Sequence, residues 1–156
     1  MAGMYVWERY KLRVRVLEEW QKILLEISGQ ISYSAESMSQ ICRQIEEAST
    51  YGKRFWRDIS IQMEEKKAGL PGNIWKNNLC KYNYWEILSA EDKRIIYQFG
   101  ESFGTLDIYS QVNEIKLYEK RIEHNVNEAR QKMIEQKKVC LFMGIISGMM
   151  AGICLL

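Results

Sequence analysis

Proline is nearly missing from this chain. Pro71 is the only one among 156 residues, where average usage of about 5% would give about eight. Stretches in which apolar and polar residues alternate, as half-buried strands require, do not occur at any length. Few turns are therefore marked by proline, and the sequence predicts an all-α protein.

Chemically reactive side chains are also scarce. The chain has one histidine, His124 in a polar stretch, and four scattered cysteines without a CxxC pair: Cys42, Cys80, Cys140 and Cys154. A zinc site needs four clustered nitrogen or sulfur ligands, and a catalytic triad needs a histidine beside its nucleophile. We therefore expect no metal, no cofactor and no enzymatic activity, and we expect reduced cysteines and an exposed His124.

Charge of one sign is not concentrated anywhere. The 22 lysines and arginines and 20 aspartates and glutamates give a net charge of only +2, and the two signs are interleaved. A nucleic-acid-binding protein usually presents a one-sided basic patch, so we expect no nucleic-acid partner. The carboxylates lie beside basic residues on polar helix faces, which predicts surface ion pairs and not an acid/base couple.

The last eighteen residues, 139–156, contain no charge at all and read VCLFMGIISGMMAGICLL. A helix of that length covers about 27 Å, close to the roughly 30 Å of a bilayer core. A buried helix of a soluble protein usually keeps a polar stripe, whereas Ser147 is the only polar residue here. We predict a domain at 1–138 and a transmembrane helix at 139–156, in contact with membrane lipid.

Basic residues flank this apolar segment on its N-terminal side. Arg130, Lys132, Lys137 and Lys138 outnumber Glu128 and Glu135. By the positive-inside rule, the domain at 1–138 is expected in the cytoplasm and the C-terminus outside.

Three glycines recur at every fourth position of the apolar segment: Gly144, Gly148 and Gly152. In lipid, helices associate through close van der Waals packing, which small residues permit. Glycine is common in membrane helices, yet the strict spacing favours a face that packs against a second transmembrane helix.

Six helices are predicted, and the last of them continues into the apolar segment. The first three cover about 7–27, 35–48 and 54–67, with Gly29 as a stop or kink after the first. A loop at 68–73 leads to a short helix at 74–79. The fifth helix is capped by Ser89 and stops at Gly100 or Gly104, and the last begins at Ile108 and is capped by Asp107. The last one repeats apolar residues in heptads, with Ile108, Ile115, Ile122 and Ala129 at one position and Val112, Val126, Met133 and Cys140 at the other. Because Glu119 interrupts this seam, an intramolecular bundle is favoured over a long coiled coil.

The segment FGESFGTLD at 99–107, followed by Gln111, resembles the central signature of the stage III sporulation protein AB family. Further resemblances keep the same order: Trp75 and Leu79, the stretch from Gly29 to Tyr33, and the glycines of the tail. In physical terms we read Phe99, Gly100, Gly104, Asp107 and Gln111 as a structural turn. The two glycines would free the backbone where one helix ends, Phe99 would pack beneath, Asp107 would cap the next helix, and Gln111 would bind exposed carbonyls of the turn.

The resemblance implies a compact cytoplasmic bundle, similar to the platform domain of type II secretion systems. It further implies a scaffold in the channel between mother cell and forespore, in the mother-cell membrane that faces the forespore. Partners would be a secretion-type ATPase and neighbouring channel membrane proteins. Two alternatives remain: a platform component of another type II secretion or type IV pilus-like system, and an unrelated tail-anchored interaction protein.

The chain departs from that family at its start. Family members begin with a transmembrane helix, whereas the seven apolar residues 1–7 would reach only about 10 Å. Four basic residues follow and would fit just inside a membrane: Arg9, Lys11, Arg13 and Arg15. We therefore expect an apolar in-frame extension upstream in the gene; the alternative is a member with one anchor.

Overall fold

The computed structural model describes residues 2–34, 36–65, 69–103 and 107–156, with the side chains of residues 83, 84 and 108 left aside. These residues form six α-helices and one short 3-10 helix, and none of the described residues is in a strand. The elements are α1 (Ala2–Tyr33), α2 (Met38–Ala48), α3 (Lys53–Glu65), α4 (Pro71–Lys81), η1 (Asn83–Ile87), α5 (Ala90–Ser102) and α6 (Ile108–Leu155). The predicted all-α bundle of about six helices is confirmed.

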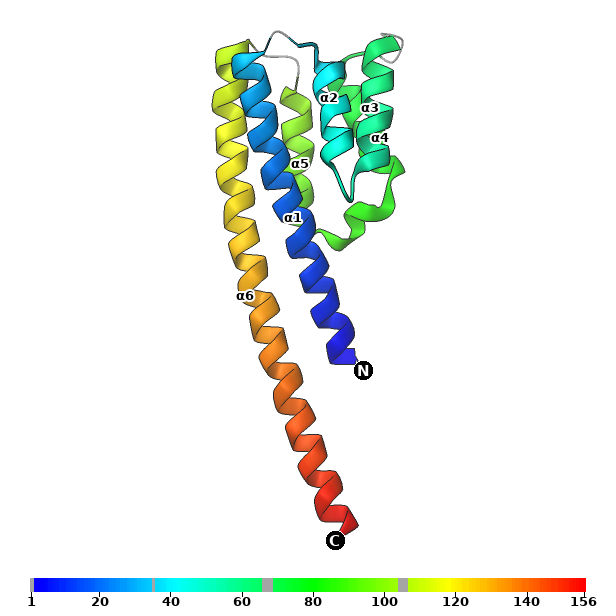
Figure 1. Ribbon diagram of the computed structural model, residues 1–156, viewed down its shortest axis with the longest axis vertical. Coiled ribbons are helices and arrows are strands. Elements are labelled where there is room, and N and C mark those ends of the chain that lie inside the picture. Colours follow the sequence, from blue (N-terminus) through cyan, green and yellow to red (C-terminus); the bar gives the residue numbers. More distant parts are fainter. Residues whose placement is uncertain (1, 35, 66–68, 104–106) are drawn as a thin grey trace.

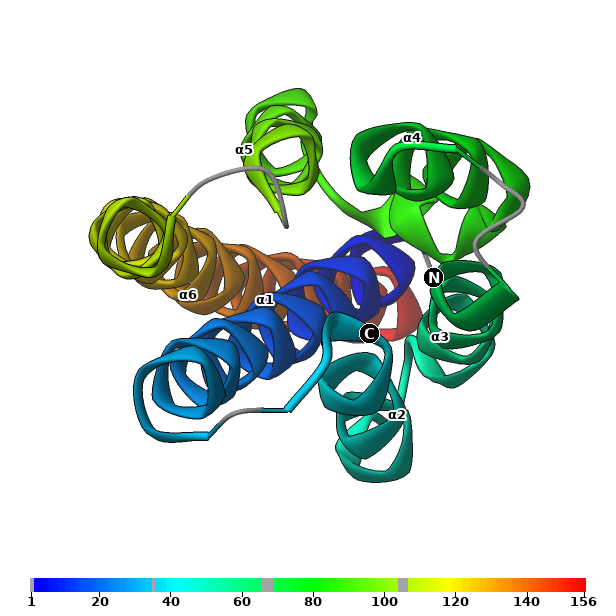
Figure 2. The same ribbon diagram turned by 90° about the horizontal axis from the view of Figure 1, so that it is seen from above.

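Two long helices form the frame of the molecule. α1 and α6 run antiparallel and side by side, and the shorter helices gather around the C-terminal half of α1 (Figures 1 and 2). α6 has 48 residues and continues far beyond the bundle to the C-terminus. The predicted heptad seam lies at the α1–α6 contact, where Ile115, Ile122, Val126 and Ala129 are at most 3% exposed.

Aromatic side chains fill the centre of the bundle. Trp20 of α1 lies between three other indoles, with ring centroids 5.7 Å from Trp56, 6.0 Å from Trp75 and 5.2 Å from Trp85. Phe55 adds edge-on contacts to the same cluster. Because the four indoles belong to four different elements, the cluster ties α1, α3, α4 and η1 into one core.

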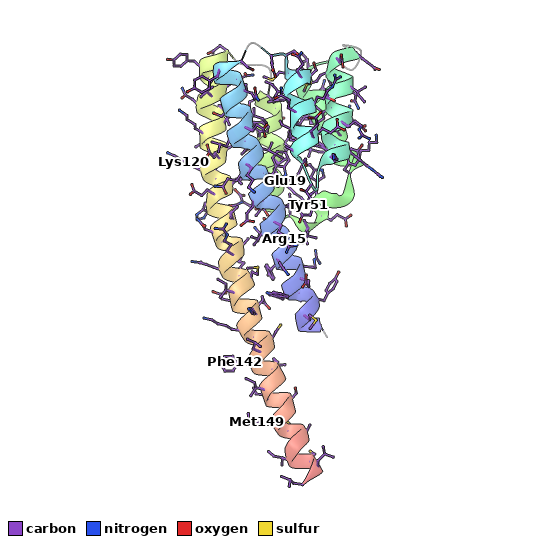
Figure 3. All side chains as sticks on the ribbon, viewed as in Figure 1. Arg15, Glu19, Tyr51, Lys120, Phe142 and Met149 are labelled. Carbon is purple, nitrogen blue, oxygen red and sulfur yellow. The ribbon has the colours of Figure 1, made fainter. Side chains whose placement is uncertain are left out.

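A single carboxylate orders the turn between α2 and α3. Glu19 of α1 accepts hydrogen bonds from the Ser49 hydroxyl at 2.6 Å and from the backbone N–H groups of Thr50 and Tyr51 at 2.9 and 3.1 Å. Figure 3 labels Glu19 and Tyr51 close to each other at this junction. The turn that the sequence predicts at Tyr51 and Gly52 is therefore held from a distant helix.

Several helix boundaries differ from prediction: α1 already begins at Ala2, α2 begins at Met38 and α4 ends at Lys81. Two further differences have a clear physical reason. α1 passes through Gly29 without a break and ends at Tyr33, because Ile31 is 8% exposed and its burial extends the packed face by one more turn. α4 begins at Pro71 and not at Ile74, since proline at the first helical position costs no hydrogen bond. Pro71 thus starts a helix where the sequence placed it in a loop.

The four cysteines are free, and His124 is exposed as expected. Cys42 is fully buried in the core, and burial raises the pKa of its thiol to about 12. That thiol therefore stays protonated and packs as a small apolar group.

Candidate functional site

The apolar end of α6 leaves the bundle as a bare helix. Among the described residues, this is the one helix long and apolar enough to cross a membrane. Its large side chains are exposed, including Phe142 at 66% and Met149 at 59%, and Figure 3 shows both well below the bundle. A surface of this kind is stable only when lipid or another apolar partner covers it.

The three glycines of the predicted packing face are unobstructed. A Cβ atom added at Gly144, Gly148 or Gly152 would meet nothing within 4 Å. Ser147 donates its hydroxyl to the Gly144 carbonyl at 3.0 Å, so its polar group is satisfied within the helix. The face is therefore smooth, apolar and accessible to a second helix backbone.

The first turn of α1 lies against the beginning of the apolar segment. A Cβ atom at Gly3 would lie 2.8 Å from the Cys140 sulfur and 4.0 Å from its Cβ atom. Met4 and Tyr5 beside it are 68% and 67% exposed. The contact between α1 and α6 therefore extends past Lys138 into the predicted membrane helix.

A shallow groove of about 440 Å³ opens near this junction, between α1, the η1 region and α6. Arg9 and Lys132 are among its lining residues, together with Tyr5, Val6 and Ile87. Lys11 lies over the ring of Trp7, 4.8 Å from its centroid. Basic and aromatic side chains thus meet on the side of the bundle from which the apolar segment leaves.

Arg13 also lines this groove, but it is nearly buried and its guanidinium binds inside the bundle, although the sequence placed it beside the membrane. It is 8% exposed, and its Nε donates to Asp92 of α5 at 2.7 Å while its other nitrogen donates to the same carboxylate at 3.1 Å. Asp92 is 0% exposed and also accepts from Asn125 of α6 at 2.7 Å and from the Ser89 N–H at 2.9 Å. This polar centre joins α1, α5 and α6.

Asp92 also contradicts the expectation that the carboxylates form surface ion pairs. Burial by itself would raise the pKa of its carboxyl, but the hydrogen bonds from Arg13, the Ser89 backbone and Asn125, with the charge of Arg13, lower the pKa below its usual value. The sequence did point to this place, because Ser89 is the predicted N-cap, and in the structure Asp92 completes a capping box with it. It gave no sign that Arg13, 79 residues earlier, is the partner.

Two signature residues, Phe99 and Gly100, lie in the second half of α5. Phe99 is 2% exposed and packs on Trp75 and Phe103 at centroid distances of 5.4 and 5.3 Å. Gly100 was expected to free the backbone where a helix ends, but α5 continues through it to Ser102. A Cβ atom at Gly100 would lie 1.8 Å from the Trp75 ring, so glycine is needed there for close helix packing.

Two further signature residues, Asp107 and Gln111, lie at the start of α6. Asp107 is the N-cap of α6, and its carboxylate accepts from the Ser110 N–H at 3.0 Å and the Ser110 hydroxyl at 2.7 Å. Those hydrogen bonds lower the pKa of the Asp107 carboxyl. Gln111 is buried at 6% exposure, and Gly104 lies outside the described residues.

Trp75 is the residue that sequence reasoning left without a role. Its indole N–H donates to the Ile96 carbonyl of α5 at 3.1 Å, and its ring covers Gly100. Gly72 lies one turn earlier on α4, and a Cβ atom added there would be 3.7 Å from the backbone of α5. A tryptophan and two glycines on facing helices make α4 and α5 pack closely beside the signature segment.

Within the described ranges, no group of three or more histidine, cysteine, aspartate or glutamate side chains could hold a metal ion. The buried carboxylate Asp92 is fully engaged by its neighbours. The arrangement can hold helices together and present an apolar rod to a membrane.

Comparison with known proteins agrees with this architecture. A family model described as stage III sporulation protein AB matches residues 1–156. The protein of that description from Bacillus subtilis (strain 168) is 24% identical over 156 residues, which cover 96% of this chain and 87% of the relative. A solved structure of a stage III sporulation protein AB superposes with a TM-score of 0.70 at 23% identity, covering 79% of this chain and 97% of the other.

Proposed function

Because the chain belongs to the stage III sporulation protein AB family, we propose that it is a membrane-held scaffold subunit of the channel complex between mother cell and forespore. The observation that carries this proposal is α6, one helix that supplies both the core seam of the bundle and an uncovered apolar segment. A scaffold needs a folded domain held at a fixed place on the membrane, and α6 provides this connection without a linker.

Membership in the family removes one alternative, the unrelated tail-anchored protein. A platform role in another secretion or pilus system would use the same bundle with different partners. The sporulation description of the matched family favours the channel complex.

The bundle is proposed to lie in the cytoplasm of the mother cell. Arg9, Lys132, Lys137 and Lys138 gather near the point where α6 becomes apolar, which favours the cytoplasmic side by the positive-inside rule. The same basic groups would attract anionic lipid headgroups at that leaflet. The C-terminus would then face the space between the two membranes.

Two kinds of protein partner follow from this placement. A secretion-type ATPase would dock on the polar cytoplasmic bundle, whose surface carries ion pairs such as Arg43–Glu64 and Arg57–Glu46. Neighbouring membrane subunits would pack against the face of Gly144, Gly148 and Gly152. The protein itself would supply position and not chemistry.

A cross-linked pull-down from sporulating cells tests the partners. The tagged full chain is expected to recover a secretion-type ATPase and other channel membrane proteins, while Gly148→Ile is expected to lose the membrane subunits and keep the ATPase. Met149→Ile is the matched control, because its side chain is already large and exposed. Unchanged recovery with Gly148→Ile would reject the packing face, and recovery of neither partner by the full chain would reject the scaffold role.

A further inference from the structure

The face of α6 that packs on α1 does not stop where the bundle ends. Ile122, Val126 and Ala129 are buried on this face. Steps of three or four residues lead from Ala129 along the same side of the helix through Met133, Gln136, Cys140, Gly144, Ser147 and Ala151. The seam changes from large to small residues as it enters the apolar segment, but it keeps its direction.

The junction between bundle and apolar segment is braced by α1. Gly3 sits directly against Cys140, which is two residues inside the predicted membrane helix. A side chain at position 3 would collide with the cysteine sulfur, so the two helices approach closely at this point. α6 therefore leaves the bundle as a supported helix.

Two polar contacts on α6 oppose its rotation within the bundle. Asn125 donates to the buried Asp92 of α5, and Arg130 forms an ion pair with Glu18 of α1. Turning α6 about its axis would break the first bond in a buried site, where an unsatisfied carboxylate oxygen is costly.

The helix also lacks the residues that usually introduce a kink. Between Ile108 and Met143 there is no glycine and no proline, and the described helix is continuous to Leu155. Sharp bends in helices nearly always occur at such residues or at bulges. Over its 48 residues α6 would be about 72 Å long.

From these observations we infer that α6 is a rigid strut that locks the rotational orientation of the membrane segment to that of the bundle. The small-residue side of the segment is held on the side of α1. A movement imposed on the cytoplasmic bundle is then transmitted as rotation or tilt to the face that meets other membrane helices. The part of this inference that concerns partner subunits rests on the proposed function.

The brace at Gly3 can be tested without reference to sporulation. The Cβ–Cβ distance of 4.0 Å between positions 3 and 140 falls in the range of roughly 3.5–4.5 Å that disulfides require. Gly3→Cys in the full chain, oxidised in native membranes, is expected to form a disulfide with Cys140. The controls are Gly3→Cys with Cys140→Ser, and Met4→Cys, which points about 100° away on the helix; neither is expected to form the bond.

The rotational lock is tested by inserting leucines between Cys140 and Leu141, which leaves the brace and the bundle intact. Two leucines turn the rest of the segment by about 200°, four by about 40° and seven by about −20°. Heat-resistant spore counts are expected to be lost with two leucines and largely kept with four or seven. All three segments remain apolar and long enough to span.

The possible results separate the claims. Absence of the Gly3→Cys disulfide overturns the inference whatever the spores show. Equal spore counts in all insertion variants overturn the rotational lock even when the disulfide forms. If cells lacking the protein sporulate normally, the proposed function fails, and the disulfide alone then decides whether α6 is braced.

Discussion

At the scale of single residues, the polar centre at Asp92 has the clearest energetic signature. Its carboxylate is inaccessible to solvent and is held by Arg13, Asn125 and the Ser89 backbone. A buried charge that loses its partner leaves the other charge uncompensated, which is far more costly than losing an exposed pair. The stability of the bundle should therefore depend strongly on this one carboxylate.

Asp92→Asn is expected to lower the free energy of unfolding by about 3–5 kcal/mol, because Arg13 stays buried without a counter-charge. The measurement is urea unfolding of the detergent-solubilised full chain, followed by tryptophan fluorescence. Glu91→Gln on the same helix is the control. It removes an exposed ion pair with Arg94 and should change stability by no more than about 1 kcal/mol.

Asp92 also makes the free energy of unfolding depend on pH. The pKa of Asp92 is lower in the folded protein than the value of about 3.9 for a free aspartate, so the unfolded state binds the proton more tightly. The stability that Asp92 contributes is complete above pH ~5 and disappears as the pH falls through the folded pKa. The difference between wild type and Asp92→Asn should hold from neutral pH to pH ~5 and shrink below it; a gap that widens on acidification would contradict this account.

Gly100 provides the second prediction at this scale. Alanine there would place a Cβ atom 1.8 Å from the rigid Trp75 ring, and overpacking of this kind costs about 1–3 kcal/mol or more. Gly72→Ala is the matched control on the facing helix, since its Cβ atom would meet neighbours at an ordinary 3.7 Å. Chemical denaturation of both variants should show a loss for Gly100→Ala only. Equal stabilities would mean that glycine at position 100 is not required for packing.

At the scale of elements, local sequence rules predict those features of a helix, such as its caps and its apolar face, that depend on neighbouring residues. The heptads of α6, the cap at Ser89 and the cap at Asp107 all act over a few residues, and each is found in the structure. The predictions for Gly29 and Gly100 were wrong because Ile31 is buried and because the ring of Trp75 covers Gly100. Both effects depend on packing against other elements, which local sequence rules do not describe. The Arg13–Asp92 pair was beyond prediction for the same reason.

The start of α6 offers a test at this scale. Asp107→Ala removes the acceptor for the Ser110 N–H and should lower the midpoint of urea unfolding modestly, because the first turn of α6 frays. Asp107→Ser should restore most of the loss, since serine also caps helices well. Hydrogen exchange should become faster in the first turn of α6 only. An unchanged midpoint and unchanged exchange would show that the cap contributes nothing.

At the scale of the whole molecule, the separation between bundle and apolar segment dominates. Burial ends along α6 while the helix continues, so one element belongs both to the core and to the proposed membrane span. The proposal of a scaffold follows from this geometry together with the family of the chain. The proposal requires that the folded bundle does not function unless the segment after Lys138 holds it at the membrane.

A count of heat-resistant spores tests this requirement most directly. In cells lacking the protein, heat-resistant spores are counted after expression of either the full chain or residues 1–138, with accumulation of both forms checked by immunoblot. The account predicts that the full chain restores spores and that 1–138 does not, even when it accumulates to the same level. Full restoration by 1–138, or normal sporulation without the protein, would contradict it.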